Sequence, residues 1–314
     1  MTGYIVRRLF GLCFNLVLVA TFVFAMMRIV PGDTAVAILG QEASIQQLEA
    51  FREKHNLGGS LLDSYRRWGT GLLQGDFGTS LRSGNSVTDD FMKRLPITLE
   101  IVVLSFTMTT GLGVIMGIWA ARRQNSGVDM GLRVVATAGI SVPNFVLLTL
   151  LLIIPARLWG YAPPFGAVSI FDNPVENLRL FVPPTLMLAI GGSAVIMRYT
   201  RSGFLEVMRQ DYIRTARSKG LSERSVTMRH AFRNALPPVM TLAGLQLGNL
   251  LGGSVILERV MSLPGLGDWL VTAIGFKDYP VVMIVVLYSA FVLMMISLLI
   301  DVLYAFVDPR IRYN

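Results

Sequence analysis

Six long apolar runs constrain this chain more than any other feature of its sequence. A helix needs about 20 predominantly apolar residues to cross the hydrocarbon core of a bilayer. Runs of about that length lie at residues 9–30, 97–121, 132–154, 181–199, 236–257 and 281–307. Only 15% of the residues are charged, whereas soluble domains carry roughly a quarter. The sequence therefore predicts an all-α integral membrane protein with six transmembrane helices.

The runs also predict how the chain is divided. We expect a first transmembrane helix, an extracytoplasmic subdomain, a core of five helices and a short tail, at residues 1–30, 31–96, 97–307 and 308–314. In the outer segment, Ser44 is expected to cap an amphipathic helix that ends near His55, and residues 75–78 give a turn. A small subdomain could bury four apolar side chains of this segment, Trp68, Leu72, Leu73 and Phe77. A solvated linker is the alternative.

Positive charges indicate the orientation of the spans, because short cytoplasmic loops carry an excess of Lys and Arg. Nine of the 28 basic residues lie between Arg198 and Arg233, and the short loops 155–180 and 258–280 hold two each. We therefore expect both termini in the cytoplasm, with Arg310 and Arg312 in the tail and the basic pair Arg7 and Arg8 before the first span. The run 9–30 is too long for a typical signal peptide and no cleavage pattern precedes Pro31, so we expect a retained anchor.

The sequence argues against an enzyme and against a soluble binding module. It has no Gly-Lys dipeptide, and so no P-loop for ATP. Cys13 is the single cysteine, and His55 and His230 are far apart, so we expect no disulfide and no metal site. Three acidic residues, Glu100, Glu258 and Asp301, lie near the ends of apolar runs, where we expect them to be solvated. The net charge of +8 is concentrated beside the spans and does not indicate nucleic-acid binding.

A basic island at residues 211–238 separates the fourth and fifth runs. Asp211 to Lys219 can form a short helix that Gly220 ends in the left-handed conformation. Ser222 can cap a second helix, which Pro237 and Pro238 are expected to break at the start of the fifth span. Two such helices would form a knob on the membrane surface, with the small Ala216 allowing close approach of a partner. A basic helix held by anionic lipid is the alternative.

The segment 201–221, RSGFLEVMRQDYIRTARSKGL, resembles the signature of the dipeptide, oligopeptide, nickel and glutathione branch of binding-protein-dependent ABC permeases. Its most specific parts are residues 211–217 and 219–221. Four further motifs agree with this family, Pro31-Gly32-Asp33, Gly75-Asp76-Phe77-Gly78-Thr79-Ser80, Pro264-Gly265-Leu266-Gly267 and Asp308-Pro309-Arg310. The resemblance covers essentially the whole chain, and the long outer segment is similar to that of the B-type subunit.

The resemblance implies a type I ABC importer permease in the inner membrane of a bacterium. Its partners would be a second permease, two ATPases that bind ATP and Mg²⁺, a solute-binding protein and membrane lipid, with no cofactor and no nucleic acid on this chain. ATPase coupling would fall to a set within the loop 200–236, namely Asp211, Tyr212, Arg214, Thr215, Ala216, Arg217, Lys219, Gly220 and Leu221. The family's Glu-Ala-Ala is Arg214-Thr215-Ala216 here, so no coupling glutamate is assigned. The solute could be a peptide, a nickel chelate, glutathione, an opine or an oligosaccharide.

The solute path is less specified. In the fifth run, Gln246 and Asn249 are polar and could line it, whereas Gly244, Gly248 and Gly252 indicate close helix packing. Bends are expected at Pro143 and at residues 191–193, and the turn at Pro264 and Gly265 is expected to face outward, at a gate or at the binding protein. Mid-span residues are mostly aliphatic, which disfavours the alternative of an ion-driven secondary carrier. A membrane scaffold with a lipid-binding loop is a third possibility.

Overall fold

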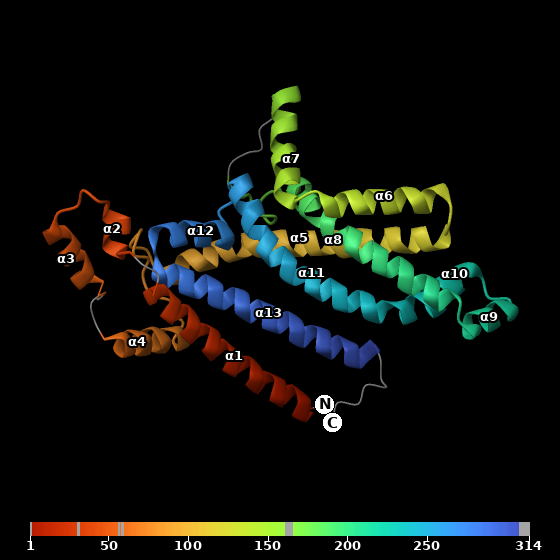
Figure 1. The fold of residues 1–314 in the computed structure, drawn as a ribbon, viewed down its shortest axis with the longest axis horizontal. Helices are drawn as coiled ribbons and strands as arrows, with labels where there is room; N and C mark the ends of the chain where they lie inside the picture. The colour runs from red at the N-terminus through yellow and green to blue at the C-terminus, as the bar shows by residue number, and fades with distance from the viewer. Residues whose placement is uncertain (1, 30–31, 56, 58–59, 161–165, 308–314) are drawn as a thin grey trace. The chain divides into compact units, whose positions relative to one another are not determined.

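The computed structural model describes residues 2–29, 32–55, 57, 60–160 and 166–307, and these are almost entirely helical (Figure 1). In the described residues, the β-structure consists of one isolated bridge between Thr79 and Ser86. The helices are α1 Thr2–Ile29, α2 Thr34–Leu39, α3 Ile45–Lys54, α4 Leu61–Leu73, α5 Val87–Arg122, α6 Gly127–Ser141, α7 Asn144–Trp159, α8 Pro174–Met208, α9 Asp211–Ser218, α10 Glu223–Ser225, the π-helical η1 Val226–Ala231, α11 Phe232–Met261, α12 Leu266–Phe276 and α13 Tyr279–Val307.

The prediction of an all-α membrane protein is confirmed. By length and composition, five helical stretches of the described residues can cross a membrane: α1, α5, α8, α13 and the run Glu223–Met261. The bent pair α6 and α7 makes a sixth if it counts as one span. The expected tail with Arg310 and Arg312, and the Asp308-Pro309-Arg310 motif, lie outside the described residues, as does Pro31.

The third span is broken where a bend was expected. Helices α6 and α7 meet at an angle of 95° (Figure 1). Pro143 lacks a backbone N–H and disfavours helical geometry in the residue before it, and Val142 is accordingly extended. Val142 caps α6 by donating its N–H to the carbonyl of Ala138, and Asn144 then begins α7. At residues 191–193, where a bend was also expected, α8 is a continuous helix.

The prediction that Pro237 and Pro238 break the helix before the fifth span is wrong. Both prolines lie inside α11, and the irregular part is the π-helical turn η1 just before it. Prolines are tolerated in membrane helices because neighbouring side chains and local changes of helix type can satisfy the backbone groups that they free. The chain therefore passes from α10 to α11 without interruption.

The described chain forms two compact units. The first contains the described residues of 2–98 and 264–295, and the second those of 99–263 and 296–307. In the first unit, a buried apolar cluster joins the start of α5, α12 and the first half of α13, with Phe91, Trp269 and Val281 among its members. The unit also holds the outer segment, whose placement on the outer side of the membrane stays a prediction.

The outer segment contains the amphipathic helix expected between Ser44 and His55. Ser44 and Gln47 form a complete capping box at the start of α3, in which each side chain binds the other residue's N–H. Residues 75–78 form the expected turn, with the N–H of Gly78 donating to Asp76 at 2.8 Å. Leu73, however, is 89% exposed, so the expectation that this part of the chain buries it is wrong for the isolated subunit.

In the second unit, α8 is the central helix, and glycines let its neighbours approach closely. A Cβ at Gly113 or Gly117 of α5 would come within 3.0 Å of atoms of α8, and one at Gly139 of α6 would lie 2.9 Å from Ile190. Small residues allow this kind of packing in membranes, where lipid removes most of the hydrophobic drive for helix association. The predicted packing of Gly244 is confirmed, since a Cβ there would overlap Ile300 of α13, whereas Gly252 faces open space.

Candidate functional site

The predicted knob is present at the end of α8, where α9 and α10 form a short helical pair (Figure 1). The boundary residues act as the sequence predicts. Asp211 begins α9, and Gly220 follows its end with a φ of +76°, a left-handed conformation that glycine adopts without steric cost. Ser222 caps α10 by accepting a hydrogen bond from the N–H of Ser225 at 3.4 Å.

The inner face of the knob is packed onto the rest of the second unit. Ile213 and Ala216 of α9 join a buried apolar cluster whose other members are Ala121, Phe204, Val226, Ala231 and Ala235. Ile213 is fully buried and Ala216 is 5% exposed. The small side chain of Ala216 therefore allows α9 to pack closely within this unit, and the interpretation that it lies on a partner-facing surface is not supported. This packing makes the helical pair a firm extension of α8.

The outer face of the knob is polar and exposed. The exposed residues include Asp211, Tyr212, Arg214, Thr215, Arg217, Lys219, Gly220 and Leu221, which are the predicted coupling residues apart from Ala216. Arg217 reaches across the turn and donates to Glu223 at 2.8 Å and 3.4 Å. The hydroxyl of Tyr212 accepts a hydrogen bond from Asn234 of α11 at 3.0 Å. These two contacts fix α9 relative to α10 and to α11.

A second feature of this unit is a cavity of about 310 Å³ at the break between α6 and α7. Gln246 and Asn249, the two polar residues expected along the path, both line it, and Asn249 donates to Gln246 at 2.8 Å. Asn144, the first residue of α7, adds a third carboxamide, which sequence reasoning missed. We call this cavity the amide pocket. In the sequence, only the neighbouring Pro143 pointed to this region. It predicted a bend, but it did not predict that the side chain of Asn144 lines a cavity.

Glycines of α8 form the wall of the amide pocket. Gly191 and Gly192 line it, and a Cβ at Gly192 would lie 2.7 Å from the amide nitrogen of Gln246. Any larger residue at Gly192 would therefore displace Gln246. Gly191 and Gly192 thus let neighbouring helices approach α8 closely, and the bend predicted at residues 191–193 stays a prediction.

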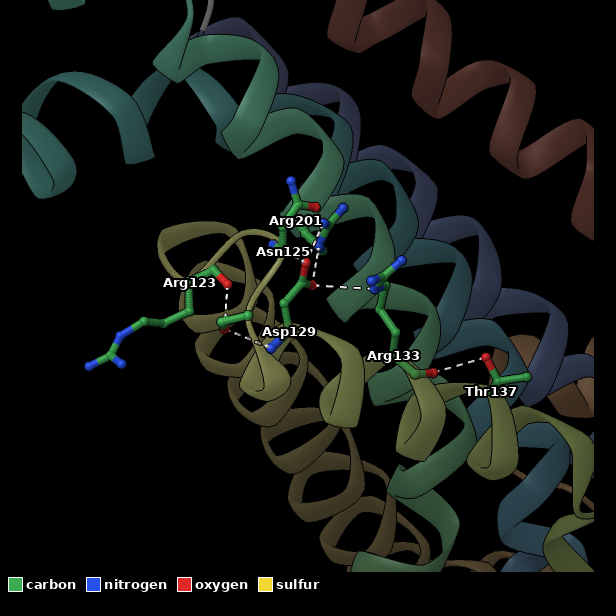
Figure 2. Close-up of polar contacts among 7 residues, drawn as sticks. Arg123, Asn125, Asp129, Arg133, Thr137 and Arg201 are labelled. Atoms are coloured by element: carbon green, nitrogen blue, oxygen red, sulfur yellow. Dashed lines mark hydrogen bonds and ion pairs between the residues drawn. The ribbon is translucent and has the colours of Figure 1, made fainter.

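A buried ion pair joins α6 to α8 (Figure 2). The side chain of Asp129, in the first turn of α6, is fully buried. Arg201 of α8 donates to it through Nε and Nη2, both at 2.7 Å. The N–H of Asn125 adds a third hydrogen bond at 3.0 Å, while the half-exposed Arg133 lies 3.4 Å away. Asp129 and Arg201 are distant in sequence, and no local pattern could have paired them.

Pro264 and Gly265 belong to the first unit, whereas Gln246 and Asn249 belong to the second. Gly265 caps α12 and is buried, and Pro264 is half-buried. The N–H of Leu266 donates to the hydroxyl of Thr98 at 2.8 Å. This turn is thus part of the packing of the first unit, and its expected role as a gate or docking point remains a prediction.

The described residues contain no cluster of His, Cys, Asp and Glu that could hold a metal ion. Among the acidic residues near the ends of spans, Glu258 differs from expectation because it is fully buried in α11. Helix packing therefore excludes this carboxyl side chain from water.

Comparison with known proteins covers the whole chain. Residues 113–313 match the family described as "Binding-protein-dependent transport system inner membrane component". Residues 1–102 match the family described as "Binding-prot-dependent transport system membrane comp, N-term". Among curated proteins, a putative peptide transport system permease protein of Brucella suis biovar 1 is 40% identical over the full length of both chains. The glutathione transport system permease protein GsiC of Salmonella paratyphi A is 39% identical, also over both full lengths.

Solved structures share the fold of the helical core. The MetNI methionine ABC transporter, in an inward facing conformation, matches with a TM-score of 0.56 at 18% identity, covering 69% of this chain and 96% of that one. An amino acid ABC transporter crystallised with histidines matches with a TM-score of 0.51 at 18% identity, covering 69% and 93%. The predicted type I ABC importer permease fold is therefore confirmed.

Proposed function

This chain belongs to the family of binding-protein-dependent transport system inner membrane components, and we propose that it forms, with a homologous permease, the ATP-driven import pathway for a peptide or similar small solute. Full-length relatives named for peptide and glutathione transport support this solute class. An extracytoplasmic solute-binding protein delivers the solute. Both termini of the chain lie in the cytoplasm, as the distribution of basic residues indicates.

The observation that carries this proposal is the firm, exposed knob at the end of α8. A permease that is driven by a separate ATPase must receive a rigid-body movement, and a loosely held loop could not transmit one. The knob has a buried apolar face, centred on Ile213 and Ala216, that holds it to its own unit. Its exposed face, from Asp211 to Leu221, is left to contact an ATPase, which binds the ATP and Mg²⁺.

The amide pocket is the proposed solute path in this subunit. In secondary transporters, discontinuous helices form the substrate site. We place the solute by analogy in this pocket, which lies at the break between α6 and α7. Its polar groups, Asn144, Gln246 and Asn249, are uncharged carboxamides that can both donate and accept hydrogen bonds. They suit a solute that carries peptide bonds.

The test is a detergent pull-down of the tagged chain from its native membrane, followed by mass spectrometry. We expect a second six-span permease and one or two P-loop ATPases to be recovered. The co-purified complex can then be assayed with trialanine and glutathione as solutes. Recovery of the chain without a nucleotide-binding subunit under mild conditions would contradict the proposal and favour an ion-driven carrier.

A further inference from the structure

The ion pair between Asp129 and Arg201 lies between the two parts of the second unit to which a function is proposed above. Along α8, Arg201 is about two turns from the end that leads to the knob. In the other direction, Gly191 and Gly192 of the same helix line the amide pocket, about 14 Å away along the axis. Helix α8 therefore connects the knob to the pocket, and Arg201 lies between them.

Helix α6 packs along α8 between the ion pair and the amide pocket. It begins beside Asp129 and ends at the break that forms the amide pocket, where Gly139 and Ile140 line the cavity. It is held to α8 at two places. Near the pocket, Gly139 packs against Ile190, and at the other end Asp129 binds Arg201 through two hydrogen bonds (Figure 2).

The geometry of the ion pair indicates that it fixes the orientation of α6 relative to α8 more than it adds to the stability of the fold. Burying two opposite charges costs about as much free energy as their attraction returns, and apolar side chains of similar size often stabilise a fold equally well. Apolar side chains can slide, whereas a guanidinium that binds a carboxylate through two parallel hydrogen bonds holds one register. Asp129 is also held by the N–H of Asn125, which has a left-handed φ of 62°.

We propose that the Asp129–Arg201 ion pair is a positioning element that makes α6 move with α8, so that a movement of the knob reaches the amide pocket. The proposal rests on the proposed function, since it needs an ATPase that acts on the knob. The two residues do not contact the solute in this role. When α8 is displaced, they keep the pocket-lining residues of α6 in a fixed position relative to those of α8.

The test measures the pocket directly and requires no knowledge of the solute. Cys13 is the single cysteine, so Cys13→Ser with Asn249→Cys places one reactive thiol of this chain in the amide pocket. The complex is purified through the tagged chain together with its partners. The rate of maleimide labelling at position 249 is then measured without nucleotide and with ATP and vanadate, and ATP hydrolysis is measured in parallel.

Two variants in this background weaken the ion pair in different ways. Arg201→Lys keeps the charge but cannot bind the carboxylate through a planar fork. The double variant Asp129→Leu with Arg201→Met replaces the pair with apolar side chains and leaves no buried charge unpaired. Arg133→Gln is the matched control, because it removes the exposed and longer contact to the same carboxylate.

We expect nucleotide to change the labelling rate in the background and in Arg133→Gln. In the two ion-pair variants, the nucleotide effect should fall about two- to thirtyfold, the range found for residues that carry coupling between sites, while ATP hydrolysis continues. If the ion pair only stabilised the fold, the variants that assemble would show the same ratio of labelling rates with and without nucleotide.

Three results would overturn the proposal. The first is an unchanged nucleotide effect in both ion-pair variants, and the second is no nucleotide effect in the background. The third is failure of both variants to assemble while Arg133→Gln assembles, which would make the pair a structural anchor. The lack of a co-purifying ATPase would overturn the proposed function as well, and it would be seen before any variant is made.

Discussion

At the scale of single residues, the backbone of the turn between α9 and α10 depends on Gly220. Its φ of +76° is strained for residues with a side chain, although asparagine tolerates this region better than most. Its N–H also donates to the carbonyl of Arg217 at 2.9 Å. Proline satisfies neither condition, because its φ is fixed near −65° and it has no N–H.

We therefore expect Gly220→Pro to abolish ATP-driven uptake while the chain still inserts into the membrane. Gly220→Asn is the matched control and should retain most of the uptake, because it can keep the left-handed turn. Uptake of labelled solute by cells that express each variant, normalised to membrane-inserted protein, checks this. Normal uptake by a well-expressed Gly220→Pro variant would count heavily against a coupling role for the knob.

An ion pair in the outer segment makes a pH-dependent contribution to stability. Asp33 caps α2, and a hydrogen bond from Arg52 lowers the pKa of its carboxyl below the ordinary value of 3.8. Because the folded pKa is lower than the unfolded one, the contribution is fully present above the unfolded pKa. It is lost as the pH falls through the folded pKa.

Arg52→Gln should raise the pKa of Asp33 toward 3.8 and make the outer segment easier to cleave. Pepsin, which is active in acid, can compare the two proteins at each pH. The wild-type segment should be cleaved more slowly than the variant above about pH 4, and the difference should disappear in stronger acid. Equal cleavage rates at every pH would show that the pair does not stabilise this segment.

At the scale of elements, Asp278 organises the connection between α12 and α13. Its buried carboxylate accepts hydrogen bonds from the hydroxyl of Ser80 and from the N–H groups of Leu81 and Arg82. Arg82 in turn stacks over the ring of Phe276, 4.0 Å from the ring centre. These contacts hold the loop before α5 against the connection between α12 and α13, which is almost 200 residues away in the sequence.

Removal of this carboxylate should destabilise the first unit. Hydrogen bonds to charged groups contribute about 1.5–3 kcal/mol each, so Asp278→Ala should lower the Tm of the purified chain by about 5 °C or more. Asp89→Ala, which removes an exposed carboxylate at the start of α5, is the control and should have little effect. A thermal unfolding assay in detergent measures both, and equal Tm values would refute the role of Asp278.

At the scale of the whole molecule, the source of energy distinguishes the proposed importer from an ion-driven carrier. The five helical stretches that can cross a membrane are apolar, and the pocket is lined by carboxamides without a charged residue. An ion-coupled carrier places ionisable residues or ion ligands in such a site. We therefore expect uptake to depend on ATP and not on an ion gradient.

Reconstituted vesicles that hold the complex allow this test. Vanadate or omission of ATP should abolish uptake of trialanine or glutathione, and a protonophore or sodium ionophore should leave it unchanged when ATP is supplied. Collapse of uptake by an ionophore at constant ATP would support a secondary carrier instead.

The sequence by itself determined the class and the start and end of α9. These depend on local signals, such as apolar length, the left-handed preference of Gly220 and the capping by Ser44 and Ser222, which act between neighbouring residues. Prolines were the weakest local signal. Pro143 coincides with the break between α6 and α7, but Pro237 lies inside a continuous α11, because packing around a membrane helix can satisfy the groups that proline frees.

Only the tertiary structure decided which side chains meet. It turned Ala216 inward, buried Glu258, and gathered Asn144, Gln246 and Asn249 around one cavity. It also paired Asp129 with Arg201 across two helices. Contacts of this kind depend on how α6, α7, α8 and α11 pack, and packing is a sum of many weak interactions between distant residues. A local stretch of sequence does not contain these long-range interactions. The sequence could therefore assign the candidate residues to helices, but it could not predict which of them lie together.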